Sequence, residues 1–227
     1  MKRVVLIQND PKVGKGSIEN NSFKIVQLNA WDNPWSQIFS DDYVVVLGGH
    51  MGVYDTKQFP YLIKEKHWIK NFVNQNGKFL GICLGAQLLA EAIGGVAFLS
   101  ANLEFGVKNF KLKTNNDLLK IFQDVPLLTW HRDTFSLPSN TEVLAKTEFP
   151  QMFEYKSSIG FQFHPEVTLD LFDTWIDSEG SREELSLHGY KIEDVRDEIA
   201  LFEDDMSKRR RIHKTLQPCG GGGGGGG

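Results

Sequence analysis

The sequence has few cysteines and no long apolar run. Only Cys83 and Cys219 occur among the 227 residues, so a disulfide framework is excluded and a reducing, cytoplasmic compartment is expected. No stretch of about 18 apolar residues is present, which excludes a membrane-spanning helix. The basic start of the chain is followed by only a short apolar run, residues 4–7, which fits a first buried strand better than a secretory signal. We therefore expect no membrane partner.

The sequence also has no excess of basic residues. Its 25 Lys and Arg stand against 29 Asp and Glu, a formal net charge of -4, so the composition favours no nucleic-acid partner. One basic cluster, Lys208–Arg211, lies near the C-terminus and is open to two interpretations. It is an anion-binding patch, or it places cations at the end of an acidic helix, where the helix dipole favours them. We favour the second interpretation, because one cluster at a chain end is weak evidence for binding.

The amino-acid composition is that of a globular protein. The chain is 41% hydrophobic and includes 16 Phe, 5 Trp and 5 Tyr, which supply the apolar surface that a core needs. Residues 220–227 are all glycine, and we set them aside as an artificial tail or as residues of unassigned identity. Residues 1–219 are expected to form a single domain, because α/β folds of this size often stay one unit.

Short apolar runs alternate with helical patterns in the first half of the chain. Buried strands are predicted at residues 4–8, 23–28, 43–47 and 78–83. A helix is predicted over residues 59–73, with Asn76-Gly77 as its stop, and a second helix over residues 84–93. Strand, helix and strand in this order form a βαβ unit. The pattern predicts an α/β fold whose strands are covered on both faces, as in a parallel sheet.

The second half of the chain is predicted to contain a β-rich part followed by a helical part. Residues 105–163 are predicted to be mostly strands, with a short helical piece at 118–122 and a hairpin over 153–163. Residues from about 168 to 215 are acidic and are predicted to form a helical C-terminal cap. Its last helix shows one apolar stripe at helical spacing: Ile192, Val195, Ile199, Phe202 and Met206.

The first candidate functional residue is Cys83, in the segment Gly81–Gln87. A strand ends at this cysteine and a helix begins directly after it, with Gly81 and Gly85 permitting a sharp turn. The arrangement is similar to the turn that carries the nucleophile in G-x-S-x-G enzymes, with sulfur in place of the hydroxyl. The helix dipole there favours a thiolate. The alternative is a buried, inert cysteine, which is the commoner fate of a lone one.

The second candidate is the pair His164 and Glu166, at the end of the predicted strand in the segment Phe161–Glu166. Pro165 fixes the chain between them, and residues i and i+2 share one side of a strand. A carboxylate beside an imidazole selects its tautomer and stabilises the imidazolium. The alternative is a surface loop in which the two side chains meet by chance.

The third candidate is the glycine-rich segment Leu47–Gly52, after the third predicted strand. Its backbone N–H groups could bind a phosphate or a tetrahedral oxyanion, or the segment could be a plain tight turn. Because it lacks the Lys-Ser/Thr of a phosphate loop, the phosphate interpretation is weak. Cys83, His164, Glu166 and this segment together supply the groups that acyl transfer through a thioester requires. All of them are predicted at the carboxyl ends of strands, where sites form in α/β sheets.

The segments Gly81–Gln87 and Phe163–Glu166 together resemble the class I (triad-type) glutamine amidotransferases. The nearest likeness is to stand-alone proteins that are similar to the glutaminase half of GMP synthase. The segment Trp130–Phe135, followed by Leu137-Pro138, is similar to the His-x-Asp segment of those members. The resemblance covers about residues 4–176. It implies a flavodoxin-like α/β fold of three layers, in which a mostly parallel or mixed central sheet has helices on both faces.

The resemblance also implies roles for individual residues. Cys83 corresponds to the nucleophile that attacks the side-chain amide of glutamine, and His164 to the base and later acid, with Glu166 as its partner. The implied oxyanion hole consists of the backbone N–H groups of Gly49 and Leu84. The implied substrate contacts are the side chains of Gln87, His131 and Asp133. For His131 a structural hydrogen-bonding role is slightly favoured over a substrate contact. For Asp133 a substrate contact and a turn cap both stay open.

Two residues near the glycines depart from the pattern or carry no role. His50 stands where many relatives have Pro, so the loop could sit differently, and a metal ligand could be suspected there. No companion ligands are apparent in the sequence, so no metal and no other cofactor is expected. Asp55 is interpreted as a turn residue rather than a catalytic acid.

Three functions follow from these residues and from the resemblance. The first is a glutaminase-type enzyme that hydrolyses glutamine to glutamate and ammonia, with the ammonia passed to a synthase or other acceptor protein. The second is a stand-alone hydrolase of γ-glutamyl amides or peptides, with the same Cys83, His164 and Glu166. The third is a non-catalytic regulatory protein of this fold, which the intact triad argues against.

Overall fold

The computed structural model describes residues 2–18 and 23–203. Three of the sequence features lie outside these residues: Met206 of the apolar stripe, the basic cluster Lys208–Arg211 and the glycine run. Within the described residues, no helix combines the length and apolar character needed to cross a membrane.

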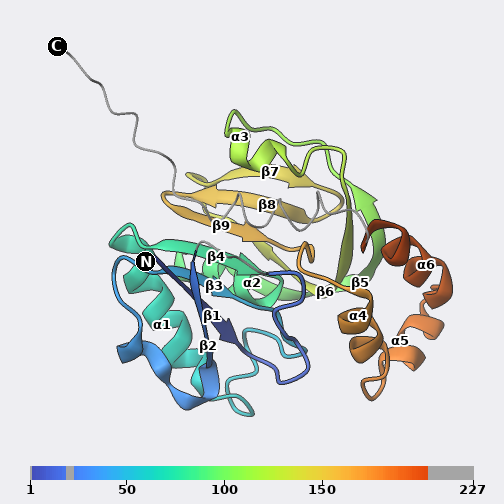
Figure 1. Cartoon of the computed structure of the whole chain (residues 1–227), viewed down its shortest axis with the longest axis horizontal. Helices are drawn as coiled ribbons and strands as arrows, with labels where there is room; N and C mark the ends of the chain where they lie inside the picture. Colours follow the sequence, from blue (N-terminus) through green and yellow to red (C-terminus); the bar gives the residue numbers. More distant parts are fainter. Residues whose placement is uncertain (1, 19–22, 204–227) are drawn as a thin grey trace.

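A seven-stranded sheet forms the centre of the molecule (Figure 1). Its strands lie in the order β2-β1-β3-β4-β9-β8-β7. The first five of these strands pair in parallel, and β8 and β7 continue the sheet with antiparallel pairing. The bounds in chain order are β1 Arg3–Gln8, β2 Lys24–Asn29, β3 Tyr43–Val46, β4 Lys78–Ile82, β7 Glu142–Lys146, β8 Pro150–Tyr155 and β9 Ser158–Phe161.

Two cores lie on the two faces of this sheet. Alternate residues of β1 contribute to each: Val5 and Ile7 belong to one cluster, Val4 and Leu6 to the other. This explains why the first strand is a continuous apolar run, since both of its faces are covered. The first cluster is completed by α1 (Tyr61–Asn74) and α2 (Leu84–Ala92).

The second face is covered by a small sheet together with helices. Strands β5 (Val96–Asn109) and β6 (Pro126–Ser136) pair antiparallel, and the short helix α3 (Asp117–Lys120) lies between them in the chain. The cap consists of α4 (Leu169–Ile176), α5 (Ser181–Leu187) and α6 (Ile192–Glu203), beside β5 and β6 in Figure 1. Two short 3₁₀ helices follow β2, η1 (Ala30–Asp32) and η2 (Pro34–Gln37).

The predicted fold class is confirmed, with helices on both faces of a mostly parallel sheet. The hairpin near the end of the sheet is also present as β8 and β9. Strand β5 begins at Val96, well before the expected start of the β-rich part. The first half of β5 has three exposed apolar residues, Val96, Phe98 and Leu99. It therefore lacks the alternation of buried apolar and exposed polar residues from which a strand is predicted.

The turn between β4 and α2 depends on two glycines. A Cβ at Gly81 would overlap the carbonyl group of Gly85 and lie 2.6 Å from the backbone nitrogen of Ala86. A Cβ at Gly85 would overlap the carbonyl oxygen of Val46, at the end of β3. The helix therefore starts in direct backbone contact with two neighbouring strands.

We expect Gly85→Ala to lower the free energy of unfolding by about 1–3 kcal/mol, because the added methyl group forces α2 away from β3. Urea unfolding followed by circular dichroism measures the change. Gly14→Ala is the matched control: nothing lies within 4 Å of its added Cβ, so stability should change little. Equal effects of the two substitutions would contradict the close approach.

Candidate active site

Cys83 lies at the turn from β4 to α2, where its thiol is buried. Its backbone has φ 52° and ψ -108°, a conformation that residues other than glycine rarely adopt. The surrounding chain holds it there: the N–H of Cys83 donates to the carbonyl of Phe161 at 2.7 Å, and its own carbonyl accepts from Ala86 and Gln87. The thiol is thereby fixed at the N-terminus of α2.

His164 and Glu166 follow the neighbouring strand β9. The backbone N–H of His164 donates to the carbonyl of Leu128 in β6 at 2.8 Å. Its Nδ1 lies 2.8 Å from Oε1 of Glu166, and both side chains are buried. Because a carboxylate accepts hydrogen bonds, Nδ1 carries a proton, which leaves Nε2 for a second partner. The thiol of Cys83 and the imidazole of His164 line the same cavity, and Cys83 contributes to the raised pKa of His164, so the three candidates form one group.

The charge state of His164 follows from these neighbours. Burial alone lowers the pKa of an imidazole, but the negative charges of the Glu166 carboxylate and of a Cys83 thiolate outweigh burial and raise the pKa of His164 to about 10. The imidazolium form is therefore the stable one at neutral pH, a state that suits a partner thiolate.

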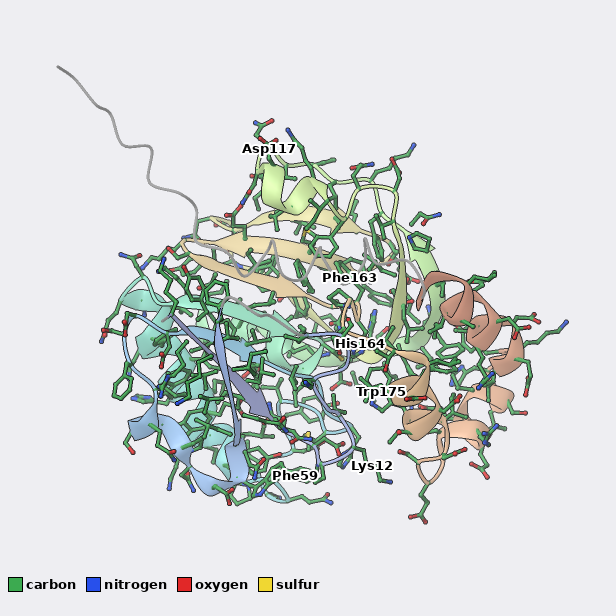
Figure 2. All side chains as sticks on the ribbon, in the orientation of Figure 1. Lys12, Phe59, Asp117, Phe163, His164 and Trp175 are labelled. Atoms are coloured by element: carbon green, nitrogen blue, oxygen red, sulfur yellow. The ribbon has the colours of Figure 1, made fainter. Side chains whose placement is uncertain are left out.

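Trp175 of α4 covers His164. The two ring centroids are 4.8 Å apart, and Figure 2 shows the two side chains next to each other, between the sheet and the cap. The indole Nε1 of Trp175 donates to the carbonyl of Lys12 at 3.1 Å. The cap therefore shields the imidazole from water and is tied to the loop after β1.

The glycine segment after β3 lies against this group. A Cβ at Gly48 would stand 3.4 Å from Cε1 of His164 and 3.5 Å from Cβ of Cys83. A Cβ at Gly49 would stand 3.0 Å from the side chain of Leu84. Leu84 is the first residue of α2, so its N–H has no acceptor within the helix. Gly49 and Leu84, the residues whose N–H groups are predicted to form an oxyanion hole, thus lie next to one another beside Cys83.

Gln87 is joined to the thiol through Gln162. Its Nε2 donates to Oε1 of Gln162 at 3.3 Å and to the carbonyl of Asp133 at 3.3 Å. The Nε2 of Gln162 in turn lies 3.6 Å from Sγ of Cys83. Sequence reasoning gave no role to Gln162, although it stands within the segment that marked His164. The predicted contact of Gln87 with glutamine stays a prediction.

His131 is held by its own neighbours. Its Nδ1 donates to the carbonyl of Asp133 at 3.0 Å, and its Nε2 lies 2.9 Å from Oε2 of Glu104. The same carboxylate oxygen accepts hydrogen bonds from Thr147 and Gln151. These contacts support the structural role, which fixes the part of β6 that carries Asp133.

Asp133 is half-buried beside the glycine segment. Tyr54 donates its hydroxyl to Oδ1 of Asp133 at 2.9 Å, and burial raises the pKa of Asp133 despite this hydrogen bond. Asp55 accepts the backbone N–H of Gly52 at 2.7 Å, which agrees with its interpretation as a turn residue. Tyr54 is a further neighbour of the site that the sequence did not single out.

His50 has a partner other than a metal. Its Nδ1 lies 2.5 Å from Oδ2 of Asp10, the residue two positions after β1, while most of the imidazole is exposed. This pair lowers the pKa of Asp10 against the opposing effect of burial. Among the described residues, no group of three His, Cys, Asp or Glu side chains is placed to hold a metal ion.

A cavity of about 390 Å³ joins these residues to the cap. Its wall includes the thiol, the imidazole and the glycine segment on one side, and residues of α4, α5 and the loop between them on the other. The residues most relevant to chemistry are Gly49, Cys83, Gln87, Asp133, His164, Trp175, Ser178, Ser181 and Glu184.

The family model for glutamine amidotransferase class-I matches residues 18–179, so the chain belongs to the class I glutamine amidotransferases. The chain is 40% identical over 99 residues to the GMP synthase [glutamine-hydrolyzing] of Cytophaga hutchinsonii, covering 40% of this chain and 19% of that protein. It is 32% identical over 118 residues to one subunit of the GMP synthase [glutamine-hydrolyzing] of Methanococcus aeolicus, covering 48% and 61% of the two chains. The chain thus spans less than two thirds of either relative.

A solved structure agrees over nearly the whole chain. The crystal structure of a glutamine amidotransferase from Thermotoga maritima superposes with a TM-score of 0.83 at 26% identity, and the match covers 96% of this chain and 99% of that one. The predicted family and its flavodoxin-like fold are confirmed by these matches.

In the Cys83→Ala protein, where no thiol supplies the proton, we expect the unfolding free energy to fall as the pH rises above about 6.5, because Glu166 raises the pKa of His164 and the folded protein holds a proton that the unfolded chain releases. The contribution is complete below pH 6.5 and is lost as the pH rises through the folded pKa, with a slope of up to about 1.4 kcal/mol per pH unit. Glu166→Gln should flatten this slope. Urea unfolding at several pH values measures it.

Asp173→Asn is the control for that experiment, since it removes a carboxylate of an exposed ion pair with Arg196. In the same Cys83→Ala protein, the slope with Asp173→Asn should match the slope without it across this pH range. The same match for Glu166→Gln would show that Glu166 does not stabilise the imidazolium.

Proposed function

We propose that this protein hydrolyses the γ-amide of glutamine to glutamate and ammonia, with Cys83 as nucleophile, His164 as base and acid, and Glu166 as the orienting carboxylate. One observation carries the proposal. The thiol stands at a helix N-terminus and lines the same cavity as an imidazole that Glu166 holds at 2.8 Å. Such a connected series of nucleophile, base and orienting group is what thioester chemistry requires.

The reaction would proceed through a thioester. In the resting ion pair the proton of the thiol already lies on Nε2 of His164, and the thiolate Sγ attacks the γ-carbonyl carbon. The N–H groups of Gly49 and Leu84 bind the oxyanion of the tetrahedral intermediate. The C–N bond then breaks, and His164 returns its proton to the leaving ammonia. Water, activated by His164, adds to the thioester and releases glutamate and the free thiol.

We further propose that the ammonia is delivered to an acceptor protein. The support is that the Methanococcus relative is named as one subunit of a GMP synthase, which implies a second one. The activity and partners of the longer relatives are not carried over, because the chain spans only 19% of the Cytophaga protein.

A second candidate is hydrolysis of a substituted γ-glutamyl amide, with an amine as the leaving group. The cavity favours it: Ser178, Ser181 and Glu184 of the cap line the same space as the thiol. The cavity therefore continues past the reacting group, on a side where a larger leaving group could lie. The non-catalytic interpretation is the weakest, because all three candidate residues are connected.

Ammonia and amine release by the purified protein from glutamine and from a panel of γ-glutamyl amides tests these functions. Cys83→Ala is the blank. Release from glutamine supports the amidotransferase, and a preference for a substituted amide supports the hydrolase. Without release from any substrate, labelling of Cys83 by a glutamine-like electrophile would indicate an enzyme that awaits its partner. Absence of labelling would contradict both enzymatic functions.

The roles of the three residues predict unequal losses. Cys83→Ser should lose nearly all turnover, because an alkoxide forms far less readily than a thiolate. Glu166→Gln should be milder than His164→Ala, since it removes the orienting group and leaves the proton carrier. Steady-state kinetics with the substrate found above measures the losses. Equal losses for Glu166→Gln and His164→Ala would contradict these assignments.

A further inference from the structure

Asn9 and Glu65 form a buried polar pair beside the glycine segment. Asn9 directly follows β1, and its Cβ is 3.6 Å from the position of a Cβ at Gly49. Glu65 lies on α1 with no exposed surface. The Nδ2 of Asn9 donates to Oε1 of Glu65 at 3.2 Å.

Each member of this pair keeps one polar atom without a partner. Oδ1 of Asn9 and Oε2 of Glu65 are both buried, and neither has a hydrogen bond to the described part of the chain. If Glu65 is a carboxylate, both atoms are acceptors and cannot satisfy one another. A proton on Oε2 would give both oxygen atoms a partner, because the acid O–H of Glu65 could then donate to Oδ1 of Asn9. Acid and amide would be joined by two hydrogen bonds in a ring.

The surroundings favour the neutral acid. Burial raises the pKa of Glu65 to about 8, although the hydrogen bond from Asn9 opposes the shift. The titratable groups nearest to the pair are Tyr61 and Asp10. Tyr61 donates its hydroxyl to the backbone carbonyl of Asn9 at 2.8 Å, and Asp10 is engaged by His50.

The pair connects with the candidate oxyanion hole in two ways. Asn9 packs against Gly49, as its Cβ position shows. The next residue, Asp10, accepts the backbone N–H of His50 at 3.4 Å, so residues 9 and 10 hold residues 49 and 50. A shift of Asn9 would therefore move the N–H of Gly49 relative to Cys83.

We propose that Glu65 is a positioning residue, which as a neutral carboxylic acid fixes Asn9 through two hydrogen bonds and thereby sets the Gly48-Gly49 segment for oxyanion binding. This rests on the proposed function, because the segment matters for turnover only if Gly49 stabilises the intermediate. An oxyanion donor acts mainly on the transition state, so its misplacement lowers kcat more than it changes KM.

Two substitutions separate this role from simple packing. Glu65→Gln keeps a neutral pair, since the amide Nε2 donates to Oδ1 of Asn9 where the acid O–H did. Glu65→Met has a similar length and removes both hydrogen bonds. We expect Glu65→Gln to retain kcat within about twofold. Glu65→Met should lose about tenfold or more, up to the roughly 10²–10³ that loss of one donor costs, with little change in KM.

A kcat for Glu65→Met equal to wild type would overturn the proposal, as would an equal loss in both variants. A second measurement requires neither enzymatic activity nor the Glu65→Met variant. It compares the melting temperatures of the wild type and of Glu65→Gln between pH 5 and pH 9. The folded wild type must keep a proton that the unfolded chain releases above about pH 4.5, so its stability falls relative to Glu65→Gln as the pH rises to about 8.

The contributions of Asp10, His50 and Tyr61 are common to both proteins and cancel in that difference. A difference that does not change with pH would show that Glu65 is not a neutral acid and would overturn the proposal. If the wild type hydrolyses no substrate and Cys83 is not labelled by the glutamine-like electrophile, the proposed function fails while the melting comparison still decides the state of Glu65. The two failures are therefore distinguishable.

Discussion

The close backbone contact between β3, β4 and the start of α2 is the constraint on which the site depends. Gly81 and Gly85 allow it, because any side chain at either position would overlap a neighbouring backbone. The contact forces Cys83 into a left-handed conformation, whose cost the strand pairing around it must offset. In return, the thiol stands at the first turn of a helix, within reach of a residue from the next strand.

The parallel sheet then gathers the other parts. Asn9, Gly49, Cys83 and His164 each come directly after, or a few residues after, the carboxyl end of a different strand, and the strands concerned are neighbours in the order β1-β3-β4-β9. Residues far apart in the chain thus meet at one edge. The cap covers this edge through Trp175, whose ring packs at a tilt against His164 and whose indole N–H donates to the carbonyl of Lys12.

Several buried polar side chains hold backbone segments in position near the site. Glu104 holds His131, which holds the backbone of Asp133, and Glu65 holds Asn9 beside Gly49. Both carboxylates are largely removed from water, which costs free energy unless each is paired or protonated. Glu104 is paired with His131, and the pKa of Glu104 is lowered despite its burial. Glu65 has an amide as its partner, and the pKa of Glu65 is raised.

The sequence by itself determined the fold class, since apolar runs of strand length separated by helical periods leave few alternatives to a covered parallel sheet. It also singled out Cys83 and His164, because local patterns of glycine and proline mark a turn at a strand end. Only the tertiary structure decided that Asp10 pairs with His50, that Gln162 reaches the thiol and that Glu65 meets Asn9. These pairs join residues 40, 79 and 56 positions apart. A hydrogen bond of that span leaves no periodic signal in the chain, because its partners are brought together by strand order rather than by spacing.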